Sequence, residues 1–197
     1  MTASVAVVVL AAGASRRLGA PKQLVRCGGQ TLLTRAVEVA QAAGCGPVFV
    51  VLGAGADFLR AEVALPDARV VVNLAWSEGI GSSVRAGVAA VEADAPDAGA
   101  ILFTVCDQPL VTAGLLAELA AAHYAGRDLV AAAYAGTVGV PALFARRYFA
   151  ELRELPGDAG AKRVLAGHAS EVFAVPFPGG EADIDTPTDA ARLAGGA

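Results

Sequence analysis

The chain has 197 residues, of which 55 % are hydrophobic, so it can bury the core of one ordinary domain without disulfides or metal staples. Its net charge of −4 includes no basic stripe or tail, which disfavours nucleic acids and anionic membranes as partners and favours small molecules. Cys27, Cys45 and Cys106 are odd in number and lack zinc spacing, so we expect free thiols in a reducing cytoplasm.

The apolar start from Val5 to Ala12 is preceded by no basic residue and is followed at once by Arg16 and Arg17, which does not fit a signal peptide. No apolar run reaches the length of a transmembrane helix. We therefore expect a single cytoplasmic domain over residues 1–197.

Strand-like and helix-like segments alternate through the first two thirds of the chain. Continuous apolar runs predict buried strands at Val5–Leu10, Val48–Leu52, Arg69–Val72 and Ala100–Val105. Helical spacing lies between and after them, at Thr31–Ala43, Ala56–Ala64, Ser82–Ala93 and Thr112–Ala122, the last two with Ser82 and Thr112 as candidate caps. This alternation predicts an α/β fold with a mostly parallel, doubly wound sheet, whose ligand crevice lies at the carboxyl ends of the strands.

The pattern changes after Leu129. Residues 129–170 read as a strand at Leu129–Tyr134, a return broken by glycine and proline at Gly136–Phe144, and two short helices, which we interpret as a small substrate-side insertion. A last strand at Val172–Val175 and a helix that begins at Pro187 complete the domain.

The loop after the first strand is a candidate phosphate cradle. Gly13 and Gly19 remove side chains where backbone N–H groups must approach phosphate oxygens, and Arg17 and Lys22 can neutralise a leaving pyrophosphate. The alternative is an ordinary strand-to-helix loop with solvated cations. Its position directly after the first buried strand favours the phosphate interpretation.

Acids follow the fourth predicted strand and precede the last helix. Asp107 stands where a carboxylate faces the crevice and can hold Mg²⁺, and Asp183 and Asp185 lie on the same side of an extended segment, with Asp185 the preferred partner of Asp107. The alternative for both sites is capping of the following helix, for which Thr186 and Pro187 are also suited.

Two further loops offer groups for ligands. The segment from Asn73 to Ser83 provides glycines and hydroxyls that can contact a nucleoside, whereas Trp76 by itself favours packing over base stacking. The segment from Gly157 to Lys162 begins another helix and can bind a second anion. His123 and His168 have no zinc-like neighbours, and we assign them structural or surface roles.

In chain order, several motifs resemble the molybdenum cofactor nucleotidyltransferases, the MobA-like NTP transferase family, over nearly the whole sequence. They are Leu10-Ala11-Ala12-Gly13 with Arg17, Gly19 and Lys22, then Asp107-Gln108-Pro109, Gly157-Asp158-Ala159-Gly160-Ala161-Lys162 and Asp183-Ile184-Asp185-Thr186-Pro187. The resemblance implies a Rossmann-like nucleotidyltransferase domain and a Mg²⁺-dependent reaction. Ala12 makes the first motif similar to the cytidylyltransferase branch, which transfers CMP from CTP to molybdopterin and releases pyrophosphate.

The resemblance also assigns roles to individual residues. It implies Arg17, Lys22 and Asp107 as catalytic residues and Asp107 and Asp185 as metal ligands. Nucleotide binding is expected from Leu10, Ala11, Ala12, Gly13, Arg17, Lys22, Gly81, Ser82, Ser83 and Asp107, and acceptor binding from Gly139, Pro141, Gly157, Asp158, Gly160 and Lys162. Ser15 and Lys162 depart from the family pattern, because many relatives carry glycine and arginine there.

Three rival functions stay open at this point. The chain could be a guanylyltransferase for the same pterin, or a nucleotidyltransferase for another phosphorylated acceptor such as a sugar phosphate or a phospholactate. It could also bind nucleotide or molybdopterin without turnover, as a carrier that hands the cofactor to a molybdoenzyme. The resemblance implies a molybdoenzyme partner of the xanthine dehydrogenase type.

Overall fold

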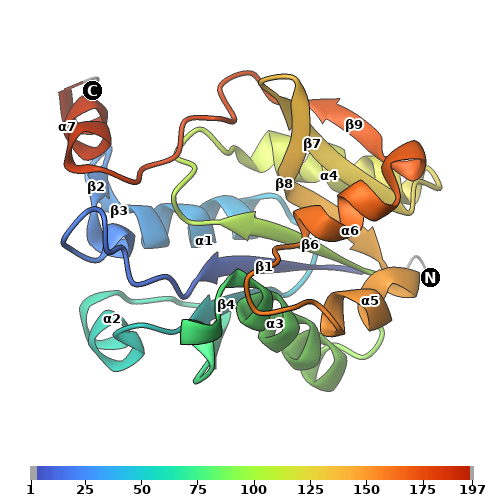
Figure 1. The fold of residues 1–197 in the computed structure, drawn as a ribbon, viewed down its shortest axis with the longest axis horizontal. Helices are drawn as coiled ribbons and strands as arrows, with labels where there is room; N and C mark the ends of the chain where they lie inside the picture. Colours follow the sequence, from blue (N-terminus) through green and yellow to red (C-terminus); the bar gives the residue numbers. More distant parts are fainter. Residues whose placement is uncertain (1–3, 196–197) are drawn as a thin grey trace.

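The computed structural model describes residues 4–195, and its centre is a seven-stranded sheet (Figure 1). The strand order is β5-β4-β1-β6-β8-β7-β9. The bounds are β1 Val5–Ala11, β4 Val48–Leu52, β5 Ala68–Val72, β6 Ala100–Val105, β7 Leu129–Tyr134, β8 Thr137–Ala145 and β9 Phe173–Pro176. Only β8 runs against its neighbours β6 and β7, while the other pairs are parallel. The predicted Rossmann-like, mostly parallel α/β fold is confirmed.

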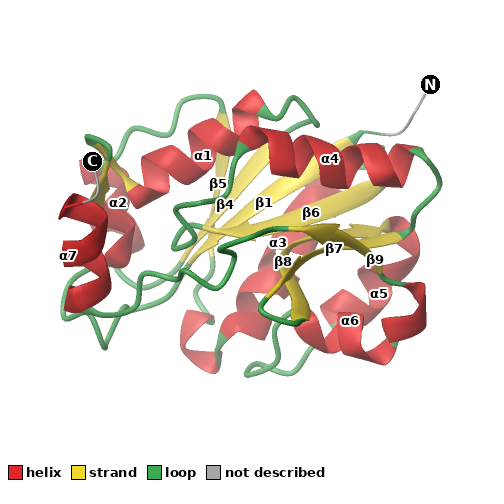
Figure 2. Ribbon diagram, turned by 90° about the horizontal axis from the view of Figure 1, so that it is seen from above, coloured by secondary structure: helices red, strands yellow, loops and turns green. Residues whose placement is uncertain are grey.

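Helices cover both faces of this sheet, with α1 and α4 on one side and α3, α5 and α6 on the other (Figure 2). The helices are α1 Leu32–Ala42, α2 Ala56–Glu62, α3 Ile80–Asp94, α4 Ala113–Tyr124, α5 Phe149–Arg153, α6 Lys162–Gly167 and α7 Pro187–Gly195. Alternate residues of β1 serve the two layers: Val7 packs in the cluster with α1 and α4, and Val8 in the cluster with α3. Burial on both faces explains why β1, β4 and β6 read as continuous apolar runs, whereas β5, at the edge of the sheet, is less buried than we predicted.

The segment after Leu129 is more closely integrated than an insertion suggests. Strand β8 pairs with β6, and β7 pairs with β8 and β9, so this part of the chain extends the central sheet. Most apolar residues of β7 and β8 are buried against the same helical layers as those of β1 and β6, whereas in the edge strand β9 only Val175 is buried. Continuous apolar burial on both faces makes sheet extension the stable arrangement.

Two local features differ from the sequence-based expectation. Helix α3 begins at Ile80, so Ser82 lies inside it and its hydroxyl donates to Gly79 O at 2.8 Å, whereas Thr112 caps α4 as expected. The strands β2 (Arg26–Cys27) and β3 (Gln30–Thr31) form a small hairpin that we did not predict. Its turn, Gly28-Gly29, has positive φ at both residues, which is the signature of a two-residue hairpin turn.

No helix within residues 4–195 is both long enough and apolar enough to cross a bilayer.

Candidate nucleotidyl transfer site

A cleft of about 390 Å³ opens at the carboxyl ends of β1 and β6. Strand β1 lies between β4, which follows it in the chain, and β6, which comes later, so this edge is a topological switch point where α/β proteins bind ligands. The lining comes from four segments: Leu10–Arg16, Lys22 with Gln23, the stretch around Trp76, Gly79 and Ser83, and Val105–Asp107. All four follow strands or begin helices at this edge of the sheet.

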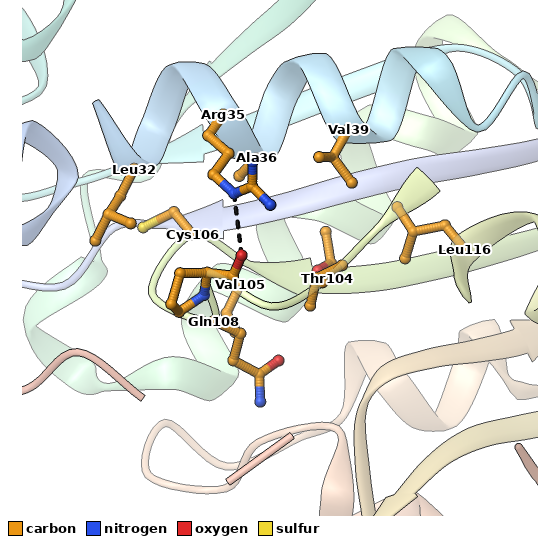
Figure 3. A pocket seen from close by; sticks show the side chains of 11 residues that line it. Leu32, Arg35, Ala36, Val39, Thr104, Val105, Cys106, Gln108 and Leu116 are labelled. Carbon is orange, nitrogen blue, oxygen red and sulfur yellow. Dashed lines mark hydrogen bonds between the residues drawn. The ribbon is translucent and has the colours of Figure 1, made fainter. Parts of the chain in front are cut away.

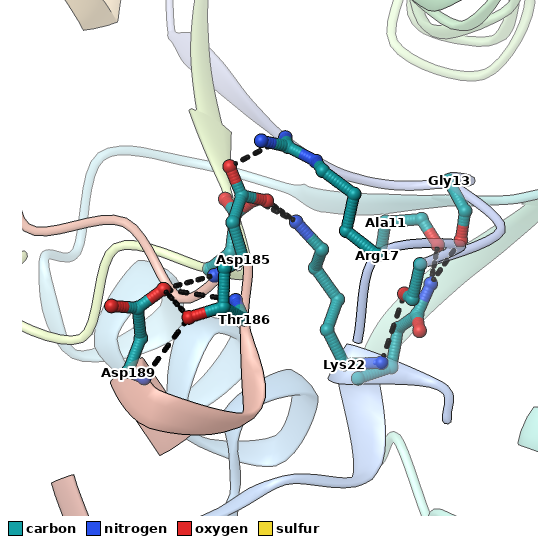
Figure 4. A network of polar contacts seen from close by, with 10 residues as sticks. Ala11, Gly13, Arg17, Lys22, Asp185, Thr186 and Asp189 are labelled. Carbon is teal, nitrogen blue, oxygen red and sulfur yellow. Dashed lines mark hydrogen bonds and ion pairs between the residues drawn. The ribbon is translucent and has the colours of Figure 1, made fainter. Parts of the chain in front are cut away.

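The loop after β1 is fixed by side chains that bond back to it (Figure 4). Gln23 is 1 % exposed and its amide nitrogen donates to Ala11 O at 2.8 Å and to Gly13 O at 3.0 Å. Ser15 has a φ of 52°, a left-handed conformation that favours glycine, and its hydroxyl accepts a bond from Lys22 N at 2.9 Å. The hydroxyl bond offsets part of the backbone cost at the position where many relatives carry glycine.

Four charged side chains from three distant parts of the chain meet at and beside the cleft. Lys22 Nζ donates to Asp107 Oδ2 at 2.7 Å and to Asp185 Oδ1 at 2.6 Å. The other oxygen of Asp185 accepts a bond from Arg17 Nη2 at 2.7 Å. A backbone bond from Ile184 N to Asp107 O, at 3.0 Å, aligns the two acidic segments. The structure therefore brings together all four residues that we expected at the reaction centre.

Capping does not account for these acids. The end of α7 nearest the cleft is capped by Thr186 and Asp189, because Thr186 Oγ1 accepts from Asp189 N at 3.3 Å and Asp189 Oδ2 accepts from Thr186 N at 2.9 Å. Thr112 caps α4. The carboxylates of Asp107 and Asp185 are thus left to bond with the cations.

The charges in this cluster stabilise one another. Burial lowers the pKa of the Lys22 ammonium, but attraction and hydrogen bonds from Asp107 and Asp185 outweigh burial and leave that pKa above its usual value. The hydrogen bond from Lys22 lowers the pKa of Asp185. At neutral pH the ammonium and the carboxylate are both charged, as an electrostatic site for phosphates and metal requires.

The acids also fit a hard divalent cation. Two carboxylates point at a single atom, Lys22 Nζ, which lies where a cation is attracted. Within residues 4–195 no three His, Cys, Asp or Glu residues cluster as a metal site. Mg²⁺ commonly takes one or two protein carboxylates and completes its shell with phosphate and water oxygens, so this pair suits a metal that is bound together with a nucleotide.

Behind the cleft, the segment after β6 is supported by helix α1. Arg35 Nε donates to Pro109 O at 3.0 Å, beside a cavity of about 10 Å³ (Figure 3). On the other side, Gln108 Nε2 donates to Gly180 O at 2.9 Å. These two bonds hold Gln108 and Pro109, the two residues that follow Asp107 in the chain.

The predicted base-contacting residues divide into one that lines the cleft and two that support it. Ser83 lines the cleft, whereas Asn73 Nδ2 donates to the hydroxyls of Ser82 at 2.8 Å and Ser83 at 3.1 Å. Gly81 N donates to Gly157 O at 2.8 Å. Trp76 borders the cleft and lies close to the backbone of Gly53. A Cβ added to Gly53 would lie only 2.5 Å from the Trp76 Cβ, so no side chain fits at this position without a shift.

The predicted acceptor residues occupy two places. The loop at Gly157 lies directly against the segment 78–81 beside the cleft, where a Cβ on Gly157 would meet Glu78 O. Gly139 and Pro141 are buried in β8 and do not line the cleft; a Cβ on Gly139 would lie 2.5 Å from the Tyr134 hydroxyl. Lys162 is exposed at the start of α6, as is Asp158 in the preceding loop, while Gly160 packs against Ile80.

Sequence reasoning did not assign functional roles to Gln23, Asn73 or Arg16. Gln23 and Asn73 are buried amides that orient the loop and the start of α3, and nothing in the sequence marks a polar residue as buried. Arg16 lines the cleft next to Arg17. The run of two arginines is a signal, but the sequence does not say which guanidinium faces the ligand.

Comparison with known proteins agrees with this geometry. The sequence profile of the MobA-like NTP transferase domain matches residues 7–172. The chain belongs to this family. Nicotine blue oxidoreductase of Paenarthrobacter nicotinovorans is 39 % identical over 168 residues, which are 80 % of this chain and 79 % of that protein.

Solved structures extend the comparison. Rv0371c of Mycobacterium tuberculosis H37Rv is 35 % identical, with a TM-score of 0.86 and 98 % of each chain covered. The same protein in complex with manganese is 32 % identical, with a TM-score of 0.83, over 98 % of this chain and 100 % of that one. Molybdopterin-guanine dinucleotide biosynthesis protein A of Archaeoglobus fulgidus shares the fold, with a TM-score of 0.65 and 20 % identity over 95 % and 96 % of the chains.

Proposed function

We propose that this MobA-like NTP transferase moves CMP from CTP to molybdopterin and releases pyrophosphate. The observation that carries the proposal is the junction of Lys22 with Asp107 and Asp185 beside the loop that follows β1. A cation-lined loop next to two converging carboxylates provides what a nucleotidyl transfer needs, namely binding of a triphosphate and of a divalent metal at one place.

Each residue has a distinct part in the proposed reaction. The acceptor phosphate attacks the α-phosphorus of CTP in line with the pyrophosphate, and this nucleophile is already anionic, so no strong general base is needed. Backbone donors near Gly13 and the cations Arg17 and Lys22 stabilise the charge of the leaving pyrophosphate. Asp107 and Asp185 would hold Mg²⁺, which supplies charge neutralisation at the phosphates when bound. The rigid loop orients the nucleotide before the acceptor arrives.

The choice of cytosine rests on the Leu-Ala-Ala-Gly motif of residues 10–13. Ala12 of this motif lines the cleft together with Trp76, so its methyl group borders the space that we propose for the nucleotide.

We assign acceptor binding to the loop from Gly157 to Lys162. This loop is fixed by its backbone bond to Gly81, which places it beside the nucleotide cleft. Lys162 and Asp158 are exposed there, so the lysine is available to an anionic acceptor. Gly139 and Pro141 act on the acceptor only through the shape of β8.

Pyrophosphate release tests the proposal. Purified protein with Mg²⁺ and molybdopterin is given CTP, GTP, ATP or UTP, each with an acceptor-free control. We expect release that depends on the acceptor and is selective for CTP. Asp107→Asn keeps the size of the side chain but removes a metal-binding charge, and we expect it to lower turnover by about two orders of magnitude or more. Near-normal turnover in this variant would remove Asp107 from the reaction.

The same assay separates the rivals. Selectivity for GTP would favour a guanylyltransferase, activity with another phosphorylated acceptor would change the substrate, and tight molybdopterin binding without pyrophosphate would favour a carrier for a molybdoenzyme of the xanthine dehydrogenase type.

The similarity to nicotine blue oxidoreductase supports a second candidate function, reduction of a related dye. Burial raises the pKa of the Cys106 thiol in this cleft, which disfavours thiolate redox chemistry there. Decolorisation of nicotine blue with an added electron donor tests that function directly.

A further inference from the structure

The three cations of the loop after β1 differ in what they already bind. Lys22 is paired with two carboxylates and Arg17 with one of them. Within residues 4–195 the guanidinium of Arg16 has no hydrogen bond and no ion pair with another side chain, although it lines the same cleft. Arg16 is therefore the cation of this loop that meets a ligand without first giving up a carboxylate.

A charge count shows why such a cation is needed. Lys22 and Arg17 together balance Asp107 and Asp185, so the paired cluster carries no excess positive charge toward a nucleotide. A nucleoside triphosphate with one bound Mg²⁺ remains anionic, and most of its charge lies on the β- and γ-phosphates. Without another cation, this tail would face a neutral cluster.

Arg16 lies on the part of the loop that borders two open spaces. Ser15, with its left-handed backbone, turns the chain just before Arg16, and the Lys22 N–H fixes that turn. Arg16 lines both the main cleft and a second hollow of about 330 Å³ on the outer side of the loop, beside Gly19 and Gly55. It thus stands at the rim where the loop separates the two spaces.

We propose that Arg16 binds the β- and γ-phosphates of the incoming nucleotide, in addition to Arg17 and Lys22. The inference rests on the proposed nucleotidyl transfer but does not depend on the base or the acceptor. A guanidinium can donate two parallel bonds to phosphate oxygens, so Arg16 adds both charge and orientation to the tail that becomes pyrophosphate. Lys22 then remains with the acids until the metal and nucleotide have bound.

Calorimetric binding separates this contact from a general charge effect. CTP, CMP and inorganic tripolyphosphate are titrated, with Mg²⁺, into the unmodified protein, Arg16→Ala, Arg16→Lys and the control Arg60→Ala. Arg60 is an exposed arginine on α2 that lines neither hollow. Because an exposed charged hydrogen bond contributes a moderate free energy, we expect Arg16→Ala to weaken CTP and tripolyphosphate about tenfold, CMP less than about twofold, and Arg16→Lys to recover part of the loss.

In turnover assays, we expect Arg16→Ala to raise the KM for CTP more than it lowers kcat. The inference is overturned if Arg16→Ala and Arg60→Ala weaken CTP equally, if CMP weakens as much as CTP, or if the unmodified protein binds neither CTP nor tripolyphosphate. Triphosphate binding that depends on Arg16 without any nucleotidyl transfer would leave the inference standing and refute the proposed function. Transfer with unchanged CTP binding in Arg16→Ala would do the reverse.

Discussion

Replacing Lys22 by methionine tests whether one ammonium stabilises both acids of the site. Methionine keeps the length and apolar stem of lysine but removes the ammonium between the two carboxylates, so that Asp107 loses its ion pair with Lys22 and Asp185 keeps only its ion pair with Arg17. The three side chains are 14 %, 21 % and 29 % exposed, which places the pairs between buried and surface salt bridges. Loss of one partner from a buried pair costs about 3–5 kcal/mol, and an exposed pair contributes about 0–1 kcal/mol.

From these limits we expect Lys22→Met to lower the free energy of unfolding by about 2 kcal/mol, and the melting temperature by roughly 4–8 °C for a chain of this size. Urea and thermal unfolding in metal-free buffer measure the loss. Lys162→Met is the matched stability control, because Lys162 is exposed and is the only other lysine in the chain. It should change stability by less than about 0.5 kcal/mol.

A divalent metal should reverse the loss, because it binds the same two carboxylates. In the unmodified protein Mn²⁺ or Mg²⁺ must displace Lys22, whereas in Lys22→Met the acids are open to it, so the rise in melting temperature should be larger in the variant. Equal stability of Lys22→Met and the unmodified protein, or equal metal stabilisation of both, would refute the electrostatic reasoning. Turnover should nevertheless fall by orders of magnitude in the variant, because the proposed pyrophosphate contact is lost.

Three further predictions follow from single residues. Gly81→Ala should lower the free energy of unfolding by about 2 kcal/mol, because the added Cβ would meet Pro156 O. The control Gly114→Ala, at an open helical position, should raise the free energy of unfolding by about 0.5–1 kcal/mol. Urea unfolding measures both changes. The free energy of unfolding of Ser15→Gly should be about 1 kcal/mol larger than that of Ser15→Ala, because both variants lose the hydroxyl and only glycine relieves the strain of the left-handed backbone. Equal free energies of unfolding would contradict this. Hydrogen bonds to two glutamates raise the pKa of His168 above 6.5. The stabilisation from its charged form is therefore present below pH 6.5 and is lost as the pH rises through the pKa of the folded state. The difference in free energy of unfolding between the unmodified protein and His168→Gln should shrink as the pH rises through this interval.

Much of this architecture is written in local patterns of the sequence. Apolar runs of strand length and helical spacing depend on near neighbours in the chain, and strands such as Val48–Leu52 and Ala100–Val105 have the predicted bounds because both of their faces are buried. The hairpin turn at Gly28-Gly29, which we did not predict, also has a local signal, since positive φ at two successive residues favours glycine. Asp107 could be chosen as a candidate site residue because an acid directly after a buried strand falls at the edge where ligands bind.

The interactions within the site depend on segments far apart in the chain, and only the tertiary structure decided them. Lys22 meets Asp107 and Asp185 across 85 and 163 positions, and no local period of a sequence encodes which distant groups will meet. The same holds for the backbone hydrogen bond between Gly81 and Gly157, and for the fact that Ser83 lines the cleft whereas Ser82 does not. By itself the sequence determined which residue types and which strand ends were available for chemistry. Folding decided that Lys22 and Arg17 pair with carboxylates and that Arg16 has no ion pair among the described residues, because electrostatic pairing depends on distance in space.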